Sequence, residues 1–520
     1  MNEILINGET LTLDDVALCA YSESVEIKLD KRVQKKIKES AKWLSDKAKD
    51  RTIYGVNTGF GSKENIRIPK GKEKELQRNL IISHAGGTGK PLNIPTVRAL
   101  MLLRINTLAK GYSGIRLKTL ETLIEMLKRR IYPIIPEQGS VGASGDLAQL
   151  SHLALVLIGE GEAIYNGERL SGCEAMRRAG LEPVELALKE GLALNNGSQF
   201  AASVCALALY DAENLLKHSV IAASMSLEAL LGFIDPFEKE IVSKRPYPGM
   251  IDVATCVRNI TQASKFLGSD KSHVQDAYSL RCIPQVLGPC WDTIKWVHKI
   301  VDVEINSATD NPLIFTDIDR SISGANFHGE PIALASDFLG IAMCEIGSIS
   351  ERRIFKLLSS HINKGLPSFL IKGDGTQSGF QIIQYTAASL VSENKNLAHP
   401  ASVDSIPTCE DQEDFVSMAP IAAIKARKIL ENLEKIVAIE LILGAQAVDL
   451  RLAQTASVRS GRKLSDLGKG TYAAYKSVRE AIAFLDKDRP VYKDIEKGLE
   501  LLKSGKILKR VEKEIGPILR

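Results

Sequence analysis

The sequence predicts a mainly α-helical protein, in which a small mixed N-terminal domain precedes a long helical bundle. Apolar residues recur at helical spacing through three long stretches, 198–232, 332–359 and 419–450. In the last stretch they form one stripe at intervals of three and four residues, made by Leu430, Leu433, Val437 and Leu441. Because helices this long bury more surface by packing together, we expect a bundle that also self-associates.

The N-terminal part mixes element types. A strand-like start and charged helical segments fill the first fifty residues, and glycine-rich pieces follow at 54–61 and 85–89. Pro95 suits the first turn of a helix, and Gly111 is a suitable residue to end it. Since a length of 520 residues exceeds what one hydrophobic core usually serves, we expect two domains, 1–195 and 196–520.

The composition excludes several classes of protein. The 67 basic and 63 acidic residues give a net charge of +4 without a long basic tract, so we expect no nucleic-acid partner. No stretch reaches about twenty unbroken apolar residues, and the N-terminus lacks the apolar segment of a signal peptide. The eight cysteines include no Cys-x-x-Cys pair, which favours reduced thiols. We therefore expect a soluble, cytoplasmic protein without membrane contact.

The sequence gives no indication of a metal or nucleotide site. His218 and His298 lie in helical stretches, and no His-x-x-x-His spacing occurs. A phosphate-binding loop of the Gly-x-x-x-x-Gly-Lys-Ser/Thr type is also missing, as is Gly-x-Gly-x-x-Gly after a strand. We expect no metal and no external cofactor.

A small-residue loop between two more regular segments has the composition of a peptide that can react with itself. Ala143-Ser144-Gly145 lies between the β-branched and proline-containing run 131–136 and the apolar helical run 147–158. If the Gly145 nitrogen attacks the Ala143 carbonyl carbon and two waters leave, the serine β-carbon becomes an exposed methylidene. Small side chains permit the sharp turn that this ring closure needs. Strained loops between rigid elements commonly hold catalytic groups.

These residues and several further blocks resemble the histidine and aromatic amino-acid ammonia-lyases. The blocks occur in the family's order, at 54–61, 191–199, 275–282, 323–328, 392–395 and 412–418. The resemblance implies a fumarase/aspartase-like helical fold and a homotetramer whose active sites are assembled from more than one chain. It also implies that Ala143, Ser144 and Gly145 form a 4-methylidene-imidazol-5-one prosthetic group.

The resemblance further implies roles for residues that are far apart in the sequence. The methylidene at Ser144 captures the substrate amine and makes it a better leaving group, and Tyr54 removes the β-proton. Because a free tyrosine has a pKa of about 10, we expect cationic groups or helix N-termini to favour the phenolate. Arg281 holds the substrate carboxylate with its planar fork. The remaining residues around the prosthetic group and the polar wall are Asn196, Gln275, Tyr278 and Phe327.

Two residues match family positions that contact an imidazole in histidine-specific members, His84 and Glu413. An imidazole needs a hydrogen-bond partner at each nitrogen, and a histidine with a carboxylate supplies both. Members that act on phenylalanine or tyrosine tend to have an amide in place of Glu413. The sequence departs from the histidine-specific pattern twice, because Gln381 stands where methionine is expected and Phe415 where histidine is expected.

We expect the non-oxidative elimination of ammonia from L-histidine to give urocanate. One alternative keeps the prosthetic group but applies it, as a lyase or a 2,3-aminomutase, to tyrosine, phenylalanine or another aromatic amino acid. An alternative of a different class is an inactive helical oligomer that serves as a scaffold. The joint presence of intact Ala143-Ser144-Gly145, Tyr54 and Arg281 argues against the scaffold.

Overall fold

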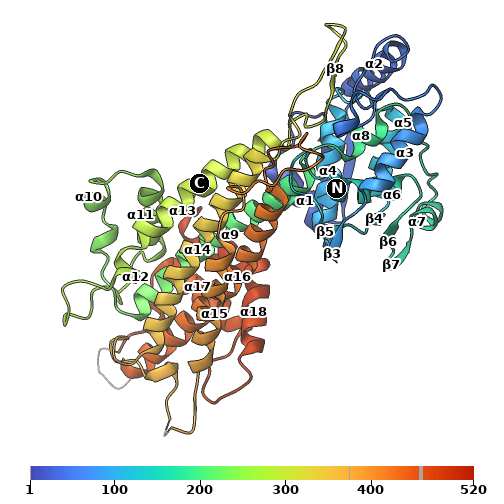
Figure 1. Ribbon diagram of the computed structural model, residues 1–520. Coiled ribbons are helices and arrows are strands. Elements are labelled where there is room, and N and C mark those ends of the chain that lie inside the picture. Colours follow the sequence, from blue (N-terminus) through green and yellow to red (C-terminus); the bar gives the residue numbers. More distant parts are fainter. Residues whose placement is uncertain (1, 374, 456–460, 520) are drawn as a thin grey trace. The chain divides into compact units, whose positions relative to one another are not determined.

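The computed structural model describes residues 2–373, 375–455 and 461–519, and the chain divides into two compact units (Figure 1). Unit 1 is made of Met1–Tyr210, Val297–Asp337 and Pro400–Lys425, and unit 2 of Asp211–Trp296, Phe338–His399 and Ala426–Arg520. Four long helices contribute residues to both units: α9 (Gln199–Ala229), α13 (Ile283–Glu304), α14 (Glu330–Leu358) and α16 (Ala419–Thr455). The units are therefore not contiguous in sequence. A single domain boundary at residue 195 remains a prediction.

Unit 1 combines helices with short strands. Its helices are α1 (Leu13–Tyr21), α2 (Lys31–Lys47), α3 (Glu73–His84), α4 (Ile94–Ala109), α5 (Leu117–Lys128), α6 (Leu147–Leu157), α7 (Gly172–Arg178) and α8 (Glu190–Asn195). Its strands are β1 (Asn2–Ile6), β2 (Val25–Leu29), β3 (Thr88–Pro91), β4 (Tyr132–Pro133), β5 (Pro136–Gln138), β6 (Glu162–Tyr165), β7 (Glu168–Ser171), β8 (Leu313–Phe315) and β9 (Arg320–Ile322). They form four small sheets: parallel β1–β2, and antiparallel β3–β5, β4–β6–β7 and β8–β9.

Helix α4 forms the core of unit 1. The Asn93 side chain caps its N-terminus by accepting a hydrogen bond of 2.9 Å from the Thr96 amide, and Pro95 lies in the first turn as predicted. Nearly every side chain from Thr96 to Ala109 is buried. Gly111, at φ +77°, follows the helix in the left-handed conformation that suits glycine at a helix end.

Unit 2 is a helical bundle, and its long helices run alongside one another in Figure 1. Besides its share of the long helices it contains α10 (Lys239–Val242), α11 (Pro248–Ile260), α12 (Tyr278–Arg281), α15 (Gln381–Leu397), α17 (Lys469–Ala481), α18 (Tyr492–Lys503) and α19 (Lys506–Ile515). The Glu440 carboxylate on α16 lies in the bundle core and accepts hydrogen bonds from Ser226 on α9 and from Ser350 and Arg353 on α14. This buried network joins three helices of the bundle. The mainly helical fold predicted from the sequence is confirmed.

Helix α14 is long and apolar enough to cross a membrane by length and composition, but 67% of its most apolar window is buried inside the fold, as in a core helix. All eight cysteines lie among the described residues and are free thiols. Four are buried, whereas Cys173 and Cys409 are exposed. Across 2–373, 375–455 and 461–519, no cluster of three or more histidine, cysteine or acidic side chains forms a candidate metal site.

Candidate active site

The Ala143-Ser144-Gly145 loop follows a backbone path that requires glycine on both sides of Ser144. Gly142 and Gly145 have φ angles of +75° and +77°. A β-carbon on Gly142 would lie 2.2 Å from the Ser417 hydroxyl oxygen, and one on Gly145 would lie 2.1 Å from the Gly197 carbonyl oxygen. Neither position can therefore hold a larger residue without moving its neighbours. A hydrogen bond of 2.7 Å from the Asp146 amide to the Gly197 carbonyl holds the loop close to Gly197.

The backbone carbonyl and the side-chain hydroxyl of Ser144 are both held by residues that are distant in the sequence. The Asn196 side-chain amide donates a hydrogen bond of 2.9 Å to the Ser144 carbonyl. The Ser144 hydroxyl donates one of 2.5 Å to Oε1 of Glu413. Ala143 packs beside them in an apolar cluster with Val416 and Met418. The loop is thus fixed in position from two other parts of unit 1.

A buried arginine supports the Asn196 side of the loop. Arg104 on α4 donates hydrogen bonds to the carbonyls of Ala193 and Asn196 and to Oε1 of Gln199. Burial lowers the pKa of its guanidinium to about 10, although nearby carboxylates oppose the shift. Arg104 satisfies carbonyls at the end of α8 and so fixes the segment that contacts Ser144. The sequence does not reveal this role, because an arginine in an apolar helix carries no sign of its partners.

A cavity of about 790 Å³ opens beside this loop in unit 1. Seven residues that the sequence predicted for the site line it together: Tyr54, His84, Ala143, Ser144, Asn196, Phe327 and Glu413. Phe415, one of the two departures from the histidine-specific pattern, lines it as well. Its ring stacks on His328 with the ring centroids 6.1 Å apart. The apolar ring of Phe415 and the carboxylate of Glu413 therefore border the same cavity.

Tyr54 is half-buried in the cavity wall, and its environment opposes ionisation. The Gly61 amide donates a hydrogen bond of 2.9 Å to its phenolic oxygen, which favours the phenolate. Burial has the larger effect and raises the pKa of the phenol, and negative neighbours, including Cys409 and Glu413, raise it further. The positive surroundings expected for this residue are not supplied by those neighbours.

His84 is the last residue of α3, and its Nδ1 lies 3.0 Å from the Ser83 hydroxyl oxygen. Burial lowers the pKa of its imidazole, so the ring is neutral at pH 7, although the Glu413 charge opposes this shift. A neutral imidazole can either donate or accept at a ring nitrogen, which suits it to contact a substrate ring.

Thr408 holds the carboxylate of Glu413 from the side opposite Ser144. Its hydroxyl donates a hydrogen bond of 2.7 Å to Oε2 of Glu413, and the two residues exchange backbone hydrogen bonds of 3.0 and 3.3 Å. Between them, Cys409, Glu410 and Asp411 all have positive φ angles. The pair closes this unusual turn and orients Glu413, a role that the sequence blocks did not reveal.

Four further predicted site residues belong to unit 2 and do not line this cavity: Gln275, Tyr278, Arg281 and Gln381. The first three lie together. Arg281 donates a hydrogen bond of 2.8 Å to Oε1 of Gln275, and its guanidinium lies 4.7 Å from the centre of the Tyr278 ring. Gln381, at the start of α15, lines a different cavity of about 660 Å³. The described structure of one chain thus divides the predicted residues into two groups.

Comparisons with known proteins show the family of the chain. The family model described as Aromatic amino acid lyase matches residues 11–480. The histidine ammonia-lyase of Alkaliphilus oremlandii is 49% identical over 517 residues, which cover 99% of each chain.

Solved structures of related enzymes also match almost the whole chain. The crystal structure of histidine ammonia-lyase from Trypanosoma cruzi matches with a TM-score of 0.90 and 39% identity, over 99% of this chain and 96% of that one. Tyrosine aminomutase from Streptomyces globisporus matches with a TM-score of 0.92 and 37% identity, over the full length of both chains. The chain belongs to the aromatic amino acid lyase family.

Proposed function

We propose that this protein is an ammonia-lyase that converts L-histidine to urocanate and ammonia, using a 4-methylidene-imidazol-5-one formed from Ala143, Ser144 and Gly145. The observation that carries the proposal is the contact of 2.5 Å between the Ser144 hydroxyl and the Glu413 carboxylate, in a cavity that His84 also lines. A carboxylate and a neutral histidine in one cavity favour a substrate ring that has a separate nitrogen for each of them, as an imidazole does. The full-length histidine ammonia-lyase relatives support the same choice.

The residues of the loop fit the prosthetic group. Gly145 lacks a side chain and has the positive φ angle that a sharp turn needs, and Ala143 is buried against Val416 and Met418. One buried oxygen, Oδ1 of Asn196, has no hydrogen-bond partner, although the amide nitrogen of the same side chain contacts Ser144. When formed, the group supplies an electrophile that takes up the substrate amine.

The other residues then have separate tasks. Tyr54 lies in the same cavity as Ser144 and is the proposed base for the β-proton. Its raised pKa means that the substrate ammonium or a nearby arginine has to favour the phenolate. Glu413 and His84 orient the imidazole, and the Phe327 side chain lines the cavity beside them. Arg281 is the proposed partner of the substrate carboxylate, since a guanidinium matches its two oxygens.

A second candidate reaction uses the same cavity for tyrosine, as a 2,3-aminomutase or a lyase. Phe415 favours it, because an apolar ring in the cavity wall packs well against an aromatic substrate. The similarity to tyrosine aminomutase is also extensive. Glu413 and His84 together favour histidine over this candidate, since an imidazole has a nitrogen for each of them whereas a phenol has one polar atom.

We further propose a homotetramer in which a second copy of the chain supplies Gln275, Tyr278 and Arg281 to the cavity of the first. Tyr278 is 70% exposed, and none of these three residues lines the unit 1 cavity of its own chain. Helix α14 also has a stripe of exposed apolar side chains, formed by Leu334, Phe338, Ile341 and Phe355. Exposed apolar side chains gathered on one helix are typical of a protein interface. A cytoplasmic location remains a prediction.

Mixing two impaired variants tests the shared site. Tyr54→Phe and Arg281→Met should each show almost no activity alone at substrate concentrations below the wild-type KM, because each impairs one half of the site. If the halves come from different chains, co-expressed variants regain part of the wild-type activity in mixed tetramers. A site built within one chain would leave every mixture with almost no activity.

The substrate is tested by incubating the purified protein with histidine, tyrosine and phenylalanine separately. Each unsaturated acid has its own ultraviolet absorbance, so the products are followed directly. We expect urocanate to form with a kcat/KM well above those of the other two reactions. Preference for tyrosine or phenylalanine would overturn the assignment of histidine.

A further inference from the structure

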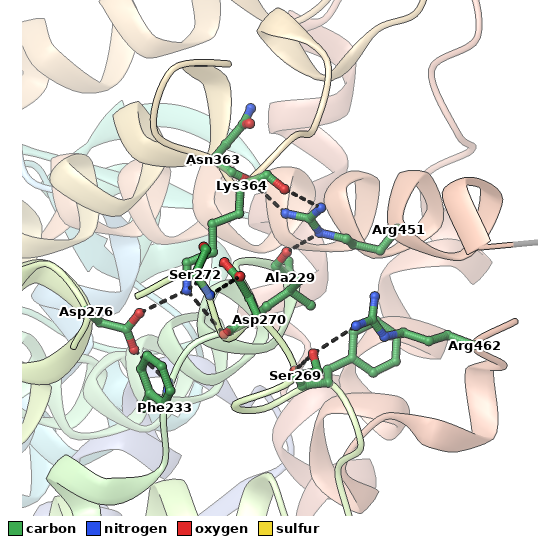
Figure 2. Close-up of polar contacts among 12 residues, drawn as sticks. Ala229, Phe233, Ser269, Asp270, Ser272, Asp276, Asn363, Lys364, Arg451 and Arg462 are labelled. Carbon is green, nitrogen blue, oxygen red and sulfur yellow. Dashed lines mark hydrogen bonds and ion pairs between the residues drawn. The ribbon is translucent and has the colours of Figure 1, made fainter. Parts of the chain in front are cut away.

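A lysine buried in unit 2 contacts the segment that carries Arg281. Lys364 follows the end of α14, and its ammonium group reaches Asp276, five residues before Arg281 (Figure 2). We propose that Lys364 is a positioning residue, which holds residues 275–281 so that Arg281 presents its guanidinium to the substrate carboxylate. The inference rests on the role of Arg281 in the proposed function.

The ion pair between Lys364 and Asp276 is shielded from water. Nζ of Lys364 lies 3.2 Å from Oδ1 of Asp276, and their side chains are 7% and 1% exposed. The same ammonium donates a hydrogen bond of 3.2 Å to the Leu231 carbonyl and lies 5.5 Å from the centre of the Phe233 ring. The second oxygen of Asp276 accepts a hydrogen bond of 2.6 Å from the Phe233 amide. Both oxygens of the carboxylate are therefore used.

The backbone of Lys364 is itself fixed by the bundle. Its φ angle of +59° is unusual for a lysine. Arg451 on α16 donates to the Lys364 carbonyl at 2.8 Å and to the Asn363 carbonyl at 2.6 Å. Nε of Arg451 also donates to the Ala229 carbonyl, at the end of α9, at 2.8 Å. Figure 2 shows these contacts converging from three segments. Lys364 thus links Asp276 to the ends of long helices.

The segment that Lys364 holds has few contacts of its own. Residues 271–275 are exposed, and Val274 is 97% exposed. Asp276 is the first buried residue after them. Its neighbour Gln275 accepts the hydrogen bond from Arg281, and the Arg281 amide donates to the Ala277 carbonyl at 3.1 Å. Asp276 is therefore the anchor between Gln275 and Ala277, the two residues that accept hydrogen bonds from Arg281.

A second anchor lies on the other side of Tyr278. The buried Arg353 guanidinium, paired with Glu440, lies 3.4 Å from the Ser279 carbonyl. The contact of Arg353 with the Ser279 carbonyl is long for a hydrogen bond, whereas Lys364 and Asp276 form a buried pair in which both groups are charged. Removing one member of a buried pair leaves the other charge without compensation. The segment would then shift, and small shifts of positioning groups reduce catalysis strongly.

The test substitutes Lys364→Met in the full-length protein. A displaced Arg281 should lower kcat/KM about a hundredfold for the amino acid that the wild type converts, mainly through a higher KM. The unsaturated acid product, which keeps the carboxylate, should inhibit the variant more weakly than the wild type. The decarboxylated amine of the substrate, which has no carboxylate, should inhibit both proteins equally. General damage to the fold would weaken the two inhibitors together.

A matched control is Lys265→Met, in the segment that leads into residues 271–275. Nζ of Lys265 lies 2.7 Å from Oδ1 of Asp466, but its side chain is 76% exposed. This control should retain the wild-type kinetics. Lys364→Arg keeps the positive charge and should recover part of the loss. If Lys364→Met does not assemble, Asp276→Asn makes the same test, because the amide still accepts a hydrogen bond from Phe233 but has no charge to pair with Lys364.

Arg281→Met distinguishes a failure of the proposed role of Arg281 from a failure of the positioning role of Lys364. If it leaves the KM unchanged, the proposed role of Arg281 is wrong. If Arg281→Met raises the KM while Lys364→Met and Asp276→Asn both behave like Lys265→Met, Arg281 holds the carboxylate and the positioning role of Lys364 is wrong. If Lys364 acts only through Arg281, adding Lys364→Met to Arg281→Met causes no further rise in KM.

Discussion

The Ser144 hydroxyl donates a hydrogen bond of 2.5 Å to Oε1 of Glu413, while Oε2 of the same carboxylate is held by Thr408 at 2.7 Å. Conversion of Ser144 to a methylidene removes that hydroxyl. One oxygen of Glu413 then loses its partner, and the other stays fixed. The carboxylate is left oriented toward the electrophile with one oxygen ready for a donor on the substrate.

Glu413→Gln tests this orientation. An amide lacks the charge and part of the acceptor capacity of the carboxylate, and a hydrogen bond to a charged group contributes about 1.5–3 kcal/mol. The kcat/KM for histidine should therefore fall roughly 10- to 100-fold. Turnover of tyrosine or phenylalanine should stay the same or improve, because a phenyl ring makes no hydrogen bond to the carboxylate and a phenol can donate equally to the oxygen of an amide.

Glu410→Gln is the control for that change. Glu410 is exposed, lies in the same turn and does not line the cavity. It should keep wild-type kinetics with all three amino acids. Equal losses in Glu410→Gln and Glu413→Gln would contradict a specific contact between Glu413 and the substrate.

Tyr54→Phe removes the phenolic oxygen and keeps the ring, which packs edge to face against Phe60. Turnover should fall at least about a hundredfold, the usual scale for loss of a general base. The mass of the peptide that contains residue 144 and the size of the assembly should not change. Tyr247→Phe, on an exposed residue of unit 2, is the control. Near-normal turnover of Tyr54→Phe would show that another group is the base.

The pH dependence follows from the direction of the Tyr54 shift. Burial and negative neighbours raise the pKa of this phenol, and the active form is the phenolate. As long as pH is below that pKa, the phenolate fraction grows about tenfold for each pH unit. The kcat/KM should therefore increase from pH 7 to pH 9 in the wild type. A flat profile over this interval would mean that the assembled site lowers the pKa of Tyr54 or uses a different base.

Much of the fold was predictable from sequence because the helices carry strong apolar periodicity. Helices α9, α14 and α16 begin and end within a few residues of the predicted stretches 198–232, 332–359 and 419–450. The glycine-rich region 85–89 shows what could not be predicted from the sequence. Its glycines carry no strand pattern, but β3 (Thr88–Pro91) pairs with β5, a partner more than forty residues away.

The site was predictable where its residues occur in contiguous blocks. Tyr54, Ser144 and Glu413 each lie in such a block, and the structure brings them to one cavity. Arg104 and Lys364 were missed, because what defines their roles is a partner about 90 residues away in each case. Such pairings depend on the folded chain.

A buried carboxyl in unit 2 gives a prediction about stability. Burial raises the pKa of Glu228 to about 7, and a hydrogen bond of 2.8 Å from the Gly468 amide opposes this only in part. The unfolded state, with a pKa of about 4.3, loses its proton first as pH rises. The free energy of unfolding therefore falls as pH increases from about 4 to 7.

The glutamine side chain in Glu228→Gln is neutral at every pH, so this variant should not show the fall in the free energy of unfolding that comes from Glu228. Its free energy of unfolding at pH 8 should exceed that of the wild type by about 1–3 kcal/mol, with little difference at pH 4. Urea denaturation at fixed protein concentration measures both values. Glu240→Gln, on the exposed part of α10, should show no such gain. A variant less stable than the wild type at pH 8 would contradict the proposed cost of ionising Glu228.

The most direct test of the mechanism is the mass of the tryptic peptide Ile131–Arg169 from active wild-type protein. Ring closure at Ala143-Ser144-Gly145 and loss of the serine hydroxyl make this peptide lighter than its encoded mass by two water molecules. Ser144→Ala should show the full mass of its own sequence and nearly no activity. An active wild-type protein whose peptide has the full encoded mass would contradict the account, because the electrophile would then not have formed.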